Sequence, residues 1–265
     1  MKFAFDLISD LHLDYTGTAE SFDWTGQATS RFCLVAGDIA RDRELLVKTL
    51  THLGECYEAV FYIDGNEEHK NYMTNLGASY KDLAKRIKTI PRVHYLQDQV
   101  IVIQGVALLA SNGWWGFDFD ETANPEIISS TWLSETSFDE VNPYIITALS
   151  HNDAAYIQRS VKRLQLHNDV KKIVIVTHTV PDTRLVDHDL QLINNWRYGV
   201  IGNSNMNYAL DLDTEKKIHT WCFGHYHGAV DRVLENRRFV NNCRGRSNHK
   251  NFTPAYFPRR IEVEI

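Results

Sequence analysis

Seven potential metal ligands follow one another along the chain, each placed where an apolar, β-branched run of residues ends. Each offers an oxygen or nitrogen donor in its side chain. The seven residues are Asp10, His12, Asp38, Asn66, His178, His225 and His227. The set contains no thiolate, and donors of this kind suit hard or borderline divalent ions. Two such ions side by side attract phosphate oxygens and activate water, so the pattern predicts a site for attack on phosphate esters.

The spacing of these residues is informative only when all groups are taken together. Asp10 and His12 stand two apart at the end of an expected strand, so we expect them to point to the same side. Gly37 before Asp38 and Gly65 before Asn66 are ordinary turn signals when considered alone. Paired imidazoles two residues apart, which follow the apolar run Trp-Cys-Phe, are more specific for a metal. Five groups in this order at successive strand ends are strong support for a metal site.

The first half of the chain alternates between buried-strand and helical patterns, which indicates βαβ crossovers and a largely parallel sheet. The expected strands are Phe3–Ile8, Phe32–Ala36 and Val60–Ile63, and the expected helices are Arg41–Leu53 and Lys70–Thr89. Later strands are expected at Val100–Ile103, Val106–Ala110, Lys172–Val176, Ile218–Phe223, Ala229–Leu234, Arg238–Asn242 and Arg260–Ile265. A further helix is expected over Asn152–Leu166, with Pro143 as an alternative start.

These elements predict an α/β fold in which two mixed β-sheets, flanked by helices, form a four-layered αββα sandwich. The metal site is expected at one sheet edge, where the loops that carry the ligands gather. The chain has 265 residues, 43% of them hydrophobic, which is enough for one sizeable core. We therefore expect residues 1–265 to form a single domain.

Taken together, these motifs resemble those of the calcineurin-like metallophosphoesterase superfamily. The resemblance rests on the order Asp-x-His, Gly-Asp, Gly-Asn, His and Gly-His-x-His, and it extends from Phe5 to about Phe252. The segments Ser111–Trp115 and Asn241–Arg246 look like those of some small bacterial members. The resemblance implies two divalent ions, with manganese expected and iron, zinc, nickel or cobalt as alternatives.

The resemblance also implies how the ligands divide between the ions. Asp10, His12 and His227 fall on the first metal, and Asn66, His178 and His225 fall on the second. Asp38 bridges the two ions and is counted among the catalytic residues. A hydroxide that bridges the metals is expected to attack phosphorus in line with the leaving oxygen.

One position departs from the family pattern. The residue after Gly-Asn is commonly histidine in the family, where it protonates the leaving group or steadies the transition state, but here it is Glu67, followed by Glu68 and His69. Glu67 is one candidate for the general acid, and His69 is another. A third interpretation is that only esters with good leaving groups react, and a fourth is that the chain is a metal-binding scaffold without catalysis.

Several weaker candidates for substrate contacts lie near these motifs. Arg41 follows the Gly-Asp motif closely enough to approach a phosphate, although a solvated charge in the first turn of a helix is the more ordinary role. Arg244 and Arg246 belong to a locally basic C-terminal stretch that either lines the phosphate entry or protects edge strands. Trp114 is a candidate for stacking on a base or aryl group, with core packing as the alternative.

Residues 111–142 form a segment of unusual composition, with seven Asp or Glu, no Lys or Arg, and three Trp. Segments of this length are often lids or binding elements, so we consider a lid and a solvated insertion with aromatic anchors as alternatives.

Composition and charge restrict the class of protein further. A formal net charge of −6 argues against nucleic acid as a partner. The sequence has no long apolar segment that would span a membrane, and its N-terminal stretch lacks the features of a secretory signal. Its four cysteines are widely spaced without a Cys-x-x-Cys motif, so we expect reduced thiols and a cytoplasmic location. The oligomeric state is left open.

The predicted function is dinuclear-metal-dependent hydrolysis of a phosphoester bond in a small phosphorylated molecule, such as a nucleotide or a phosphodiester. A nuclease is the first alternative, but only the C-terminal stretch offers basic charge for it. A protein phosphatase is the second, and the long acidic insertion fits its open surface poorly. The third alternative is the non-catalytic metal-binding interaction scaffold.

Overall fold

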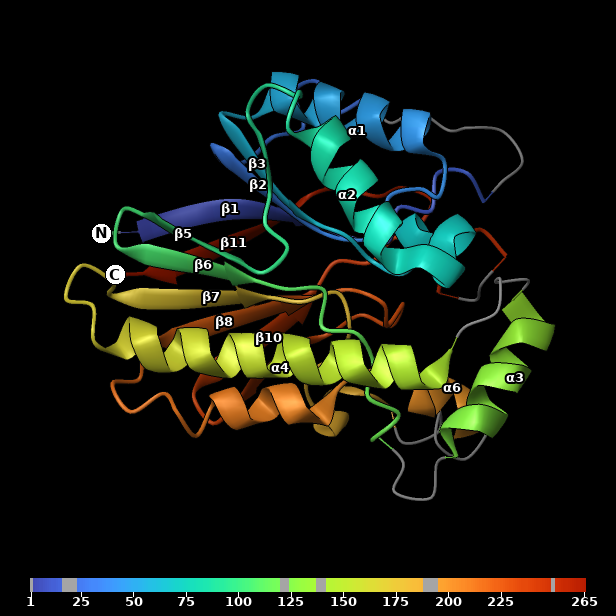
Figure 1. Cartoon of the computed structure of the whole chain (residues 1–265). Coiled ribbons are helices and arrows are strands. Elements are labelled where there is room, and N and C mark those ends of the chain that lie inside the picture. Colours follow the sequence, from blue (N-terminus) through green and yellow to red (C-terminus); the bar gives the residue numbers. More distant parts are fainter. Residues whose placement is uncertain (1, 16–22, 120–123, 137–141, 188–194, 249–250) are drawn as a thin grey trace.

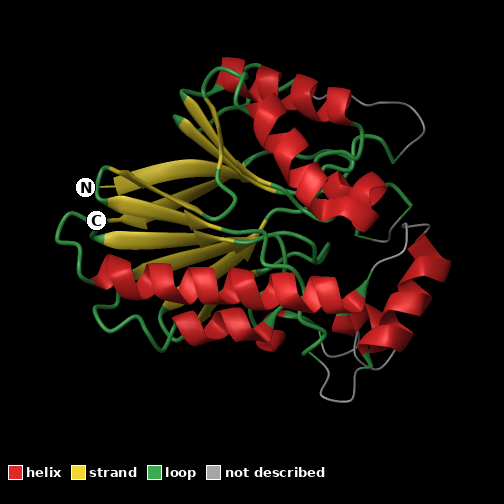
Figure 2. Ribbon diagram, in the orientation of Figure 1, coloured by secondary structure: helices red, strands yellow, loops and turns green. Residues whose placement is uncertain are grey.

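Two β-sheets pack face to face, and helices cover the outer face of each sheet (Figures 1 and 2). The computed structural model describes residues 2–15, 23–119, 124–136, 142–187, 195–248 and 251–265. The N- and C-termini lie near each other at one end of the sheets, and α3 and α6 lie at the opposite end (Figure 1). This is the four-layered arrangement that the strand and helix pattern predicts.

The first sheet has five strands in the order β11-β1-β2-β3-β4. Their bounds are Lys2–Ile8 (β1), Phe32–Ala36 (β2), Ala59–Ile63 (β3), Val93–Tyr95 (β4) and Arg259–Glu264 (β11). Strands β1 to β4 run parallel, and β11 pairs antiparallel with β1. The sheet is therefore mixed, as predicted.

The second sheet has six strands in the order β5-β6-β7-β8-β10-β9. Their bounds are Gln99–Ile103 (β5), Val106–Ala110 (β6), Lys172–Val176 (β7), Ile218–Phe223 (β8), Asp231–Leu234 (β9) and Arg237–Asn241 (β10). Strands β6, β7, β8 and β10 run parallel, and the two edge strands are antiparallel to their neighbours. This sheet is mixed as well.

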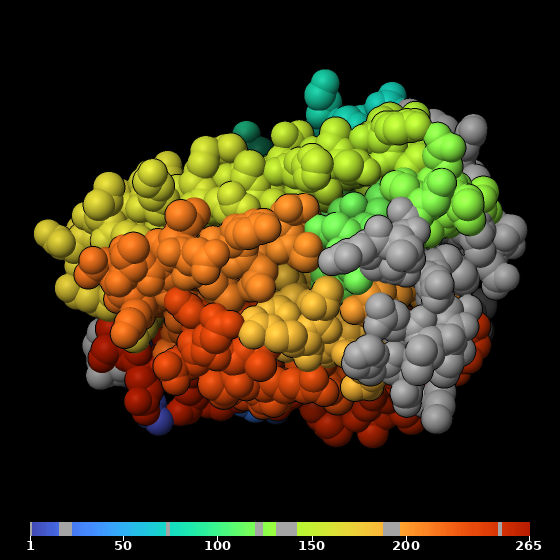
Figure 3. All heavy atoms as spheres, turned by 90° about the horizontal axis from the view of Figure 1, so that it is seen from below, coloured from blue at the N-terminus to red at the C-terminus, as the bar shows by residue number. Residues whose placement is uncertain are grey.

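Helices α1 (Arg43–Cys56) and α2 (Leu76–Ile87) cover the first sheet, whereas α4 (Pro143–Gln165) covers the second (Figure 1). The remaining helical segments are α3 (Pro125–Thr136), α6 (Asn195–Gly199) and the 3₁₀ helices η1 (Glu67–Asn75), η2 (Thr183–Leu185) and η3 (Ser204–Ala209). Helix α4 and the segment around η3 lie side by side on the outer face of the second sheet (Figure 3). Within the described chain, no helix is long and apolar enough to cross a membrane.

The layers are held together by apolar side chains on both faces of each sheet. In β1, the alternate residues Phe3, Phe5 and Leu7 are buried between the two sheets. Ile8, which points the other way, packs in the cluster between the first sheet and its helices. Burial on both faces explains why the central strands read as continuous apolar runs rather than as alternating ones.

The strand register brings the ends of the parallel strands to one edge of the sandwich. Ala36 at the end of β2 pairs with Ile63 at the end of β3. In the second sheet, Val176 at the end of β7 lies opposite both Ala110 and Cys222. Because the carboxyl ends of these strands are level, the loops that follow them meet at the same place.

The predicted elements agree with this architecture, and most strand bounds are correct to within two residues. The prediction of one helix over residues 70–89 was wrong in part, because residues 67–75 form the 3₁₀ helix η1 and α2 begins only at Leu76. Helix α4 starts at Pro143, the alternative start, where Asn142 caps the backbone N–H of Tyr144 and Ile145. The three-residue strand β4 and the helix α3 were not predicted.

Candidate metal centre

The predicted ligands of the first metal lie together at the shared edge of the two sheets. The donor atoms of Asp10, His12 and His227 lie within 4.8 Å of one another. His12 Nε2 is 3.0 Å from His227 Nε2, and His227 Nε2 is 3.3 Å from Asp10 Oδ1. Asp10 and His12 follow β1, whereas His227 follows β8, so this cluster joins the first sheet to the second.

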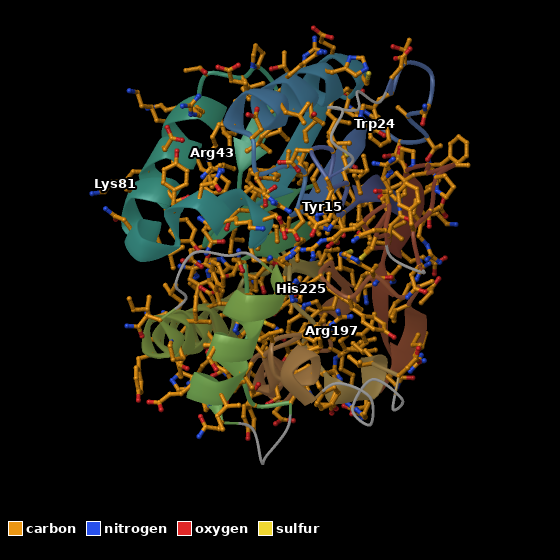
Figure 4. All side chains as sticks on the ribbon, turned by 90° about the vertical axis from the view of Figure 1, so that its right-hand side faces the viewer. Tyr15, Trp24, Arg43, Lys81, Arg197 and His225 are labelled. Atoms are coloured by element: carbon orange, nitrogen blue, oxygen red, sulfur yellow. The ribbon has the colours of Figure 1, made fainter. Side chains whose placement is uncertain are left out.

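The predicted ligands of the second metal form a neighbouring cluster. The donor atoms of Asp38, His178 and His225 also lie within 4.8 Å of one another. Asn66 Oδ1 lies 3.1 Å from His178 Nε2, which places the fourth predicted ligand in the same group. In Figure 4, His225 lies near the boundary between the part of the molecule that contains the first sheet and the part that contains the second. Tyr15 lies on the other side of that boundary.

Asp38 lies between the two clusters, where a bridging ligand would be needed. Its Oδ2 atom is 3.3 Å from His178 Nε2 in the second cluster and 3.8 Å from His12 Nε2 in the first. Its other oxygen, Oδ1, accepts a hydrogen bond from the backbone N–H of Glu67 at 2.8 Å. One carboxylate oxygen therefore faces both ligand groups while the other is anchored to the protein.

Several ligands are held by left-handed backbone, which non-glycine residues rarely adopt. The φ angles are +53° at Asp10, +46° at His12, +56° at Asp38 and +63° at His225. Asp10 and His12 thus converge through turns beyond the end of β1, not through the strand alternation that their spacing suggested. Unusual backbone of this kind persists only where the surroundings fix it, and it concentrates at functional sites.

The ligand loops are hydrogen-bonded to one another as well as to their own strands. Asp10 N–H donates to Gly37 O at 3.0 Å, and Gly224 N–H donates to His178 O at 2.8 Å. The backbone N–H of His225 donates to the Asp10 carboxylate, at 3.0 Å from Oδ1. The last of these bonds connects a loop of the first sheet to a loop of the second, so the ligand loops form one connected frame.

Gly65 allows the close approach of the loops after β2, β3 and β7. A Cβ at this position would collide with Asp38 Oδ1 and would lie 2.7 Å from His178 Cε1. Any side chain at Gly65 would therefore displace two of the predicted ligands. The Gly-Asn signal, which is only a turn signal by itself, here marks a position where the site has no room for a side chain.

Neighbouring groups fix the orientation of two imidazole rings. His178 Nδ1 lies 2.8 Å from Ala36 O, so its Nε2 faces the Asp38 and Asn66 oxygens. His225 Nε2 lies 2.9 Å from Val200 O, which leaves Nδ1 for a metal. The ring of His225 also stacks on Trp115, with centroids 5.8 Å apart and an interplanar angle of 15°. Such outer contacts select the tautomer of a ligating histidine.

The protonation of the cluster tests whether these residues suit a cation. Burial, together with the charges of nearby imidazoles, lowers the pKa of His225 to about 3 and that of His12 well below its ordinary value. Burial would also lower the pKa of His178, but the Asp38 and Asp10 carboxylates raise it to about 10. The neutral His12 and His225 rings offer lone pairs, and the carboxylates that hold a proton on His178 attract positive charge, so the residues fit divalent ions.

Glu67 lies beside the centre, and its carboxylate is bound by two arginines. Arg41 Nε donates to Glu67 Oε2 at 2.5 Å, and Arg246 Nη2 donates to Glu67 Oε1. The carboxylate is buried, and one of its oxygens lies within 4.8 Å of donor atoms of both His12 and Asp38. The structure therefore brings together three residues that the sequence placed in separate motifs.

His69 is placed in the protein interior, with both ring nitrogens engaged. Its Nε2 lies 2.7 Å from Asp64 Oδ2 and its Nδ1 lies 2.8 Å from Ser79 Oγ. All three side chains are completely buried. The ring also packs against Tyr80 and Trp114. A histidine held in this way is not positioned to reach a leaving group at the metal centre.

Two of the predicted substrate contacts also have structural roles. Trp114 is fully buried, and its Nε1–H donates to Tyr80 OH at 2.6 Å. Arg244 is buried too, where its Nη1 donates to Leu11 O at 3.0 Å and its guanidinium lies over the Phe252 ring. Of the weaker candidates, only Arg41 and Arg246 are brought to the centre. Residues 120–123 and 137–141 of the predicted lid lie outside the described residues.

Glu68 supports the site in a way that the sequence did not reveal. Its buried carboxylate accepts the backbone N–H groups of Gly65, Asp38 and Ile39 at 2.7, 3.0 and 2.7 Å. Burial and the Asp38 carboxylate raise the pKa of Glu68 to about 8. The N–H of Ala40 also donates to it at 3.4 Å, so Asp38, Ile39 and Ala40 are all about thirty residues away in the sequence, and no local signal could have identified the role.

A cavity of about 1010 Å³ lies elsewhere in the molecule. Its lining comes from α2, β4, β5 and α4 and the loops beside them, and includes Tyr80, Arg92, Tyr95 and Asp153. The loops that carry the metal ligands do not contribute to this lining.

Solved structures share the fold of this chain. A phosphopantetheinyl hydrolase (PptH) from Mycobacterium tuberculosis is 20% identical, with a TM-score of 0.69 over 97% of this chain and 95% of that one. A dimetal phosphatase from Danio rerio is 12% identical, with a TM-score of 0.57 over 98% of each chain. The protein TT1561 of Thermus thermophilus is 9% identical, with a TM-score of 0.53 over 91% of this chain and 88% of that one.

Comparison of the sequence with models of protein families gives no match, and neither does comparison with curated proteins. The likeness is therefore carried by three-dimensional structure at low sequence identity, and it extends over nearly the whole chain. It agrees with the order of the ligand motifs, which follow the strand ends as the sequence indicated. The chain has the fold of the calcineurin-like metallophosphoesterases.

Proposed function

We propose that this protein is a dinuclear-metal-dependent hydrolase of phosphoester bonds that acts on a small phosphorylated molecule. The observation that carries the proposal is the pair of donor clusters joined by Asp38. Asp10, His12 and His227 hold one ion, Asn66, His178 and His225 hold the other, and Asp38 bridges them. The shared fold with a dimetal phosphatase supports this assignment.

We propose manganese as the native metal, with which the donor set of carboxylate and amide oxygens, imidazole nitrogens and no thiolate is compatible. Iron, zinc, nickel and cobalt remain the alternatives to be compared in the assay. Two divalent ions in this place supply positive charge for a phosphate group and lower the pKa of water that becomes the nucleophile. The two carboxylates offset only part of that charge, so the centre attracts an anionic substrate.

The protein residues have separate tasks in this proposal. The loops after five strands hold the ligands in fixed orientations, so little reorganisation is needed when a substrate binds. Asp38 is anchored through Oδ1, which keeps Oδ2 between the two clusters. His69 is assigned to the structural network with Asp64 and Ser79 and not to proton transfer.

The substrate class is proposed as a small phosphorylated compound rather than a nucleic acid or a protein. The net charge of −6 disfavours nucleic acid, and the structurally similar M. tuberculosis protein is named a phosphopantetheinyl hydrolase. We also propose that residues 1–265 act as one domain, because both sheets contribute ligands. The four cysteines are free thiols, which supports a cytoplasmic location.

The test is hydrolysis of p-nitrophenyl phosphate and of bis-p-nitrophenyl phosphate by protein that has been stripped of metal and reloaded. We expect p-nitrophenol release that depends on added Mn²⁺, Fe²⁺, Zn²⁺, Ni²⁺ or Co²⁺ and that the Asp38→Asn substitution abolishes. The His151→Gln variant, altered at an exposed position on α4, is the matched control and should retain activity. Absence of release with every metal, for both esters, would contradict the proposal.

A further inference from the structure

Glu67 forms the centre of a polar cluster that borders the metal ligands. Its backbone N–H donates to the inner oxygen of Asp38, so its position is tied to the bridging ligand. Its side chain is only 2% exposed, yet both carboxylate oxygens accept hydrogen bonds from guanidinium groups. With a guanidinium donor on each of its oxygens, the carboxylate has the bonding geometry of a side chain that orients cations.

The two arginines come from loops that are far apart in the sequence. Arg41 follows β2, and Arg246 follows β10. Both guanidinium carbons lie 4.7 Å from the centroid of the Tyr15 ring. Each guanidinium is thus held by the Glu67 carboxylate and by the face of an aromatic ring, two interactions that fix its position more firmly than either alone.

The arginines retain donors that can bind an anion at the metal centre. The side chain of Arg41 is 24% exposed and that of Arg246 is 15% exposed, whereas Glu67 is closed off from solvent. Arg246 Nε is buried and has no hydrogen-bond partner in the described part of the chain. The cluster adjoins the first ligand group, because Glu67 and His12 both place a donor atom within 4.8 Å of Asp38.

We propose that Glu67 is a positioning residue that aims Arg41 and Arg246 at a terminal phosphate, and that this clamp makes phosphate monoesters the preferred substrate class. The inference rests on the proposed function and adds a substrate class to it. Two guanidinium groups and one carboxylate add one net positive charge next to the metals. A monoester carries a second negative charge near neutral pH that a diester lacks, so it gains more from this charge.

The shape of the two ester classes leads to the same preference. A terminal phosphate has three oxygens that carry no substituent, and guanidinium groups bind such oxygens through paired N–H donors. In a diester one of these oxygens carries a carbon substituent, so only two oxygens remain free to accept those hydrogen bonds. The guanidinium groups of Arg41 and Arg246 would then face an apolar substituent. Their N–H donors would lose hydrogen bonds to water and gain no acceptor in return.

The decisive measurement is binding of inorganic phosphate to the Mn²⁺-loaded chain of residues 1–265 by titration calorimetry, which requires no turnover. We expect Arg41→Gln and Arg246→Gln each to weaken phosphate binding by about tenfold to a hundredfold. Glu67→Gln should weaken it by about tenfold or more, because the arginines lose their anchor. If Glu67 acted only through its charge, its removal would leave the site more positive and would strengthen binding.

The chain offers a closely matched control for this substitution. Asp231 also binds two arginines, with Arg238 Nε at 2.8 Å and Arg259 as the second partner, but it lies on the edge strand β9 and belongs to none of the donor clusters among the described residues. Asp231→Asn should leave phosphate affinity unchanged. Unchanged or stronger phosphate binding by Glu67→Gln, with normal binding by Asp231→Asn, would overturn the clamp.

Kinetics separate the clamp from acid catalysis by Glu67. The clamp predicts that Glu67→Gln and Arg246→Gln lower the ratio of monoester to diester kcat/KM by about tenfold or more. Because Glu67 does not protonate the leaving group in this proposal, its substitution should lower kcat/KM by the same factor for good and poor leaving groups. An acid would instead give a loss that grows with the basicity of the leaving group and would leave phosphate affinity intact, which overturns the proposal.

A rescue experiment covers the case in which Glu67→Gln does not fold. Arg246→Ala removes a partly exposed side chain, and added guanidinium ion should restore phosphate binding and monoester hydrolysis in that variant. No rescue, together with normal phosphate affinity in Arg246→Ala, would overturn the proposal. If the wild-type protein hydrolyses neither ester class, the proposed function fails, whereas the phosphate titration still decides whether the clamp exists.

Discussion

The Nε2 atom of His12 lies 3.0 Å from the Nε2 atom of His227. The two rings come from different sheets, and each directs a nitrogen at the same small space beside Asp10. Burial lowers the pKa of His12 well below its ordinary value, so this ring is neutral and can give its lone pair to an ion. The pair therefore forms two sides of the site that is proposed for the first ion.

The first prediction concerns metal content. Asp38→Asn should reduce the metal content from two ions per chain to fewer than one, because Asp38 is the residue that faces both clusters. The measurement is elemental analysis after dialysis against metal-free buffer. The exposed His151→Gln variant should keep two ions. Retention of both ions by Asp38→Asn would contradict the bridging role.

The second prediction concerns stability on metal binding. Ions that bind only the folded state should raise its free energy of unfolding by about 2.7 kcal/mol per site at a hundred times the dissociation constant. Thermal unfolding with and without chelator measures the effect as an increase in Tm. The same increase in Asp38→Asn would show that the ions stabilise the protein from some other place.

The third prediction concerns His69. His69→Gln should lower the free energy of unfolding by about 2–3 kcal/mol, because Asp64 and Ser79 would lose a shared, fully buried partner. Urea denaturation measures this loss. Metal content and the dependence of kcat on the leaving group should stay as in wild type. A selective loss of activity toward poor leaving groups, with unchanged stability, would instead identify His69 as the acid.

The fourth prediction concerns the pH dependence of folding. Burial and the Asp98 carboxylate raise the pKa of Asp153 to about 8, although N–H groups of Trp114 and Gly113 bond to it. The folded state therefore holds a proton that the unfolded state releases near pH 4. It follows that this group lowers stability progressively as the pH rises from about 4 to about 8, and that the loss levels off above that range.

Asp153→Asn keeps an acceptor for the two N–H groups and removes the titration. Relative to wild type, the variant should gain at least about 1.4 kcal/mol in unfolding free energy between pH 5 and pH 9, the equivalent of one pKa unit. Urea unfolding of the metal-free protein at both values measures the gain. Parallel pH profiles for the two proteins would show that Asp153 is ionised in the fold.

The sheet and the ligand order were predictable because they depend on local patterns. Apolar runs mark the buried strands, and several of these runs stop where a ligand motif begins. The order of the motifs therefore predicted both the fold and the position of the candidate metal site. Residues 67–75 were not predictable in the same way. Their spacing suits a helix, but the contacts of Glu67 and Glu68 with the loop after β2 hold this segment in a tighter 3₁₀ form.

The roles of individual polar residues were the harder part, because they depend on partners that are distant in sequence. Glu67 and Arg246 are 179 positions apart, and nothing near either of them indicates the pairing. His69 was a candidate acid by position alone, and only its contacts with Asp64 and Ser79 place it in the interior. Trp114 was open to a binding role or a packing role, and its burial decides for packing.

The frame of hydrogen-bonded ligand loops has a mechanical consequence for the whole molecule. The bond from the His225 N–H to Asp10 joins the two sheets at the edge where the metals are proposed to bind. Arg244 N–H, after β10, bonds to Ser9 O, after β1, and so adds a second tie between the sheets. Separation of the two sheets at this end would therefore also separate the proposed metal ligands from one another. The proposed metal ligands thus lie on the same loops whose hydrogen bonds join the two sheets, so these ligands cannot separate without weakening the contact between the sheets.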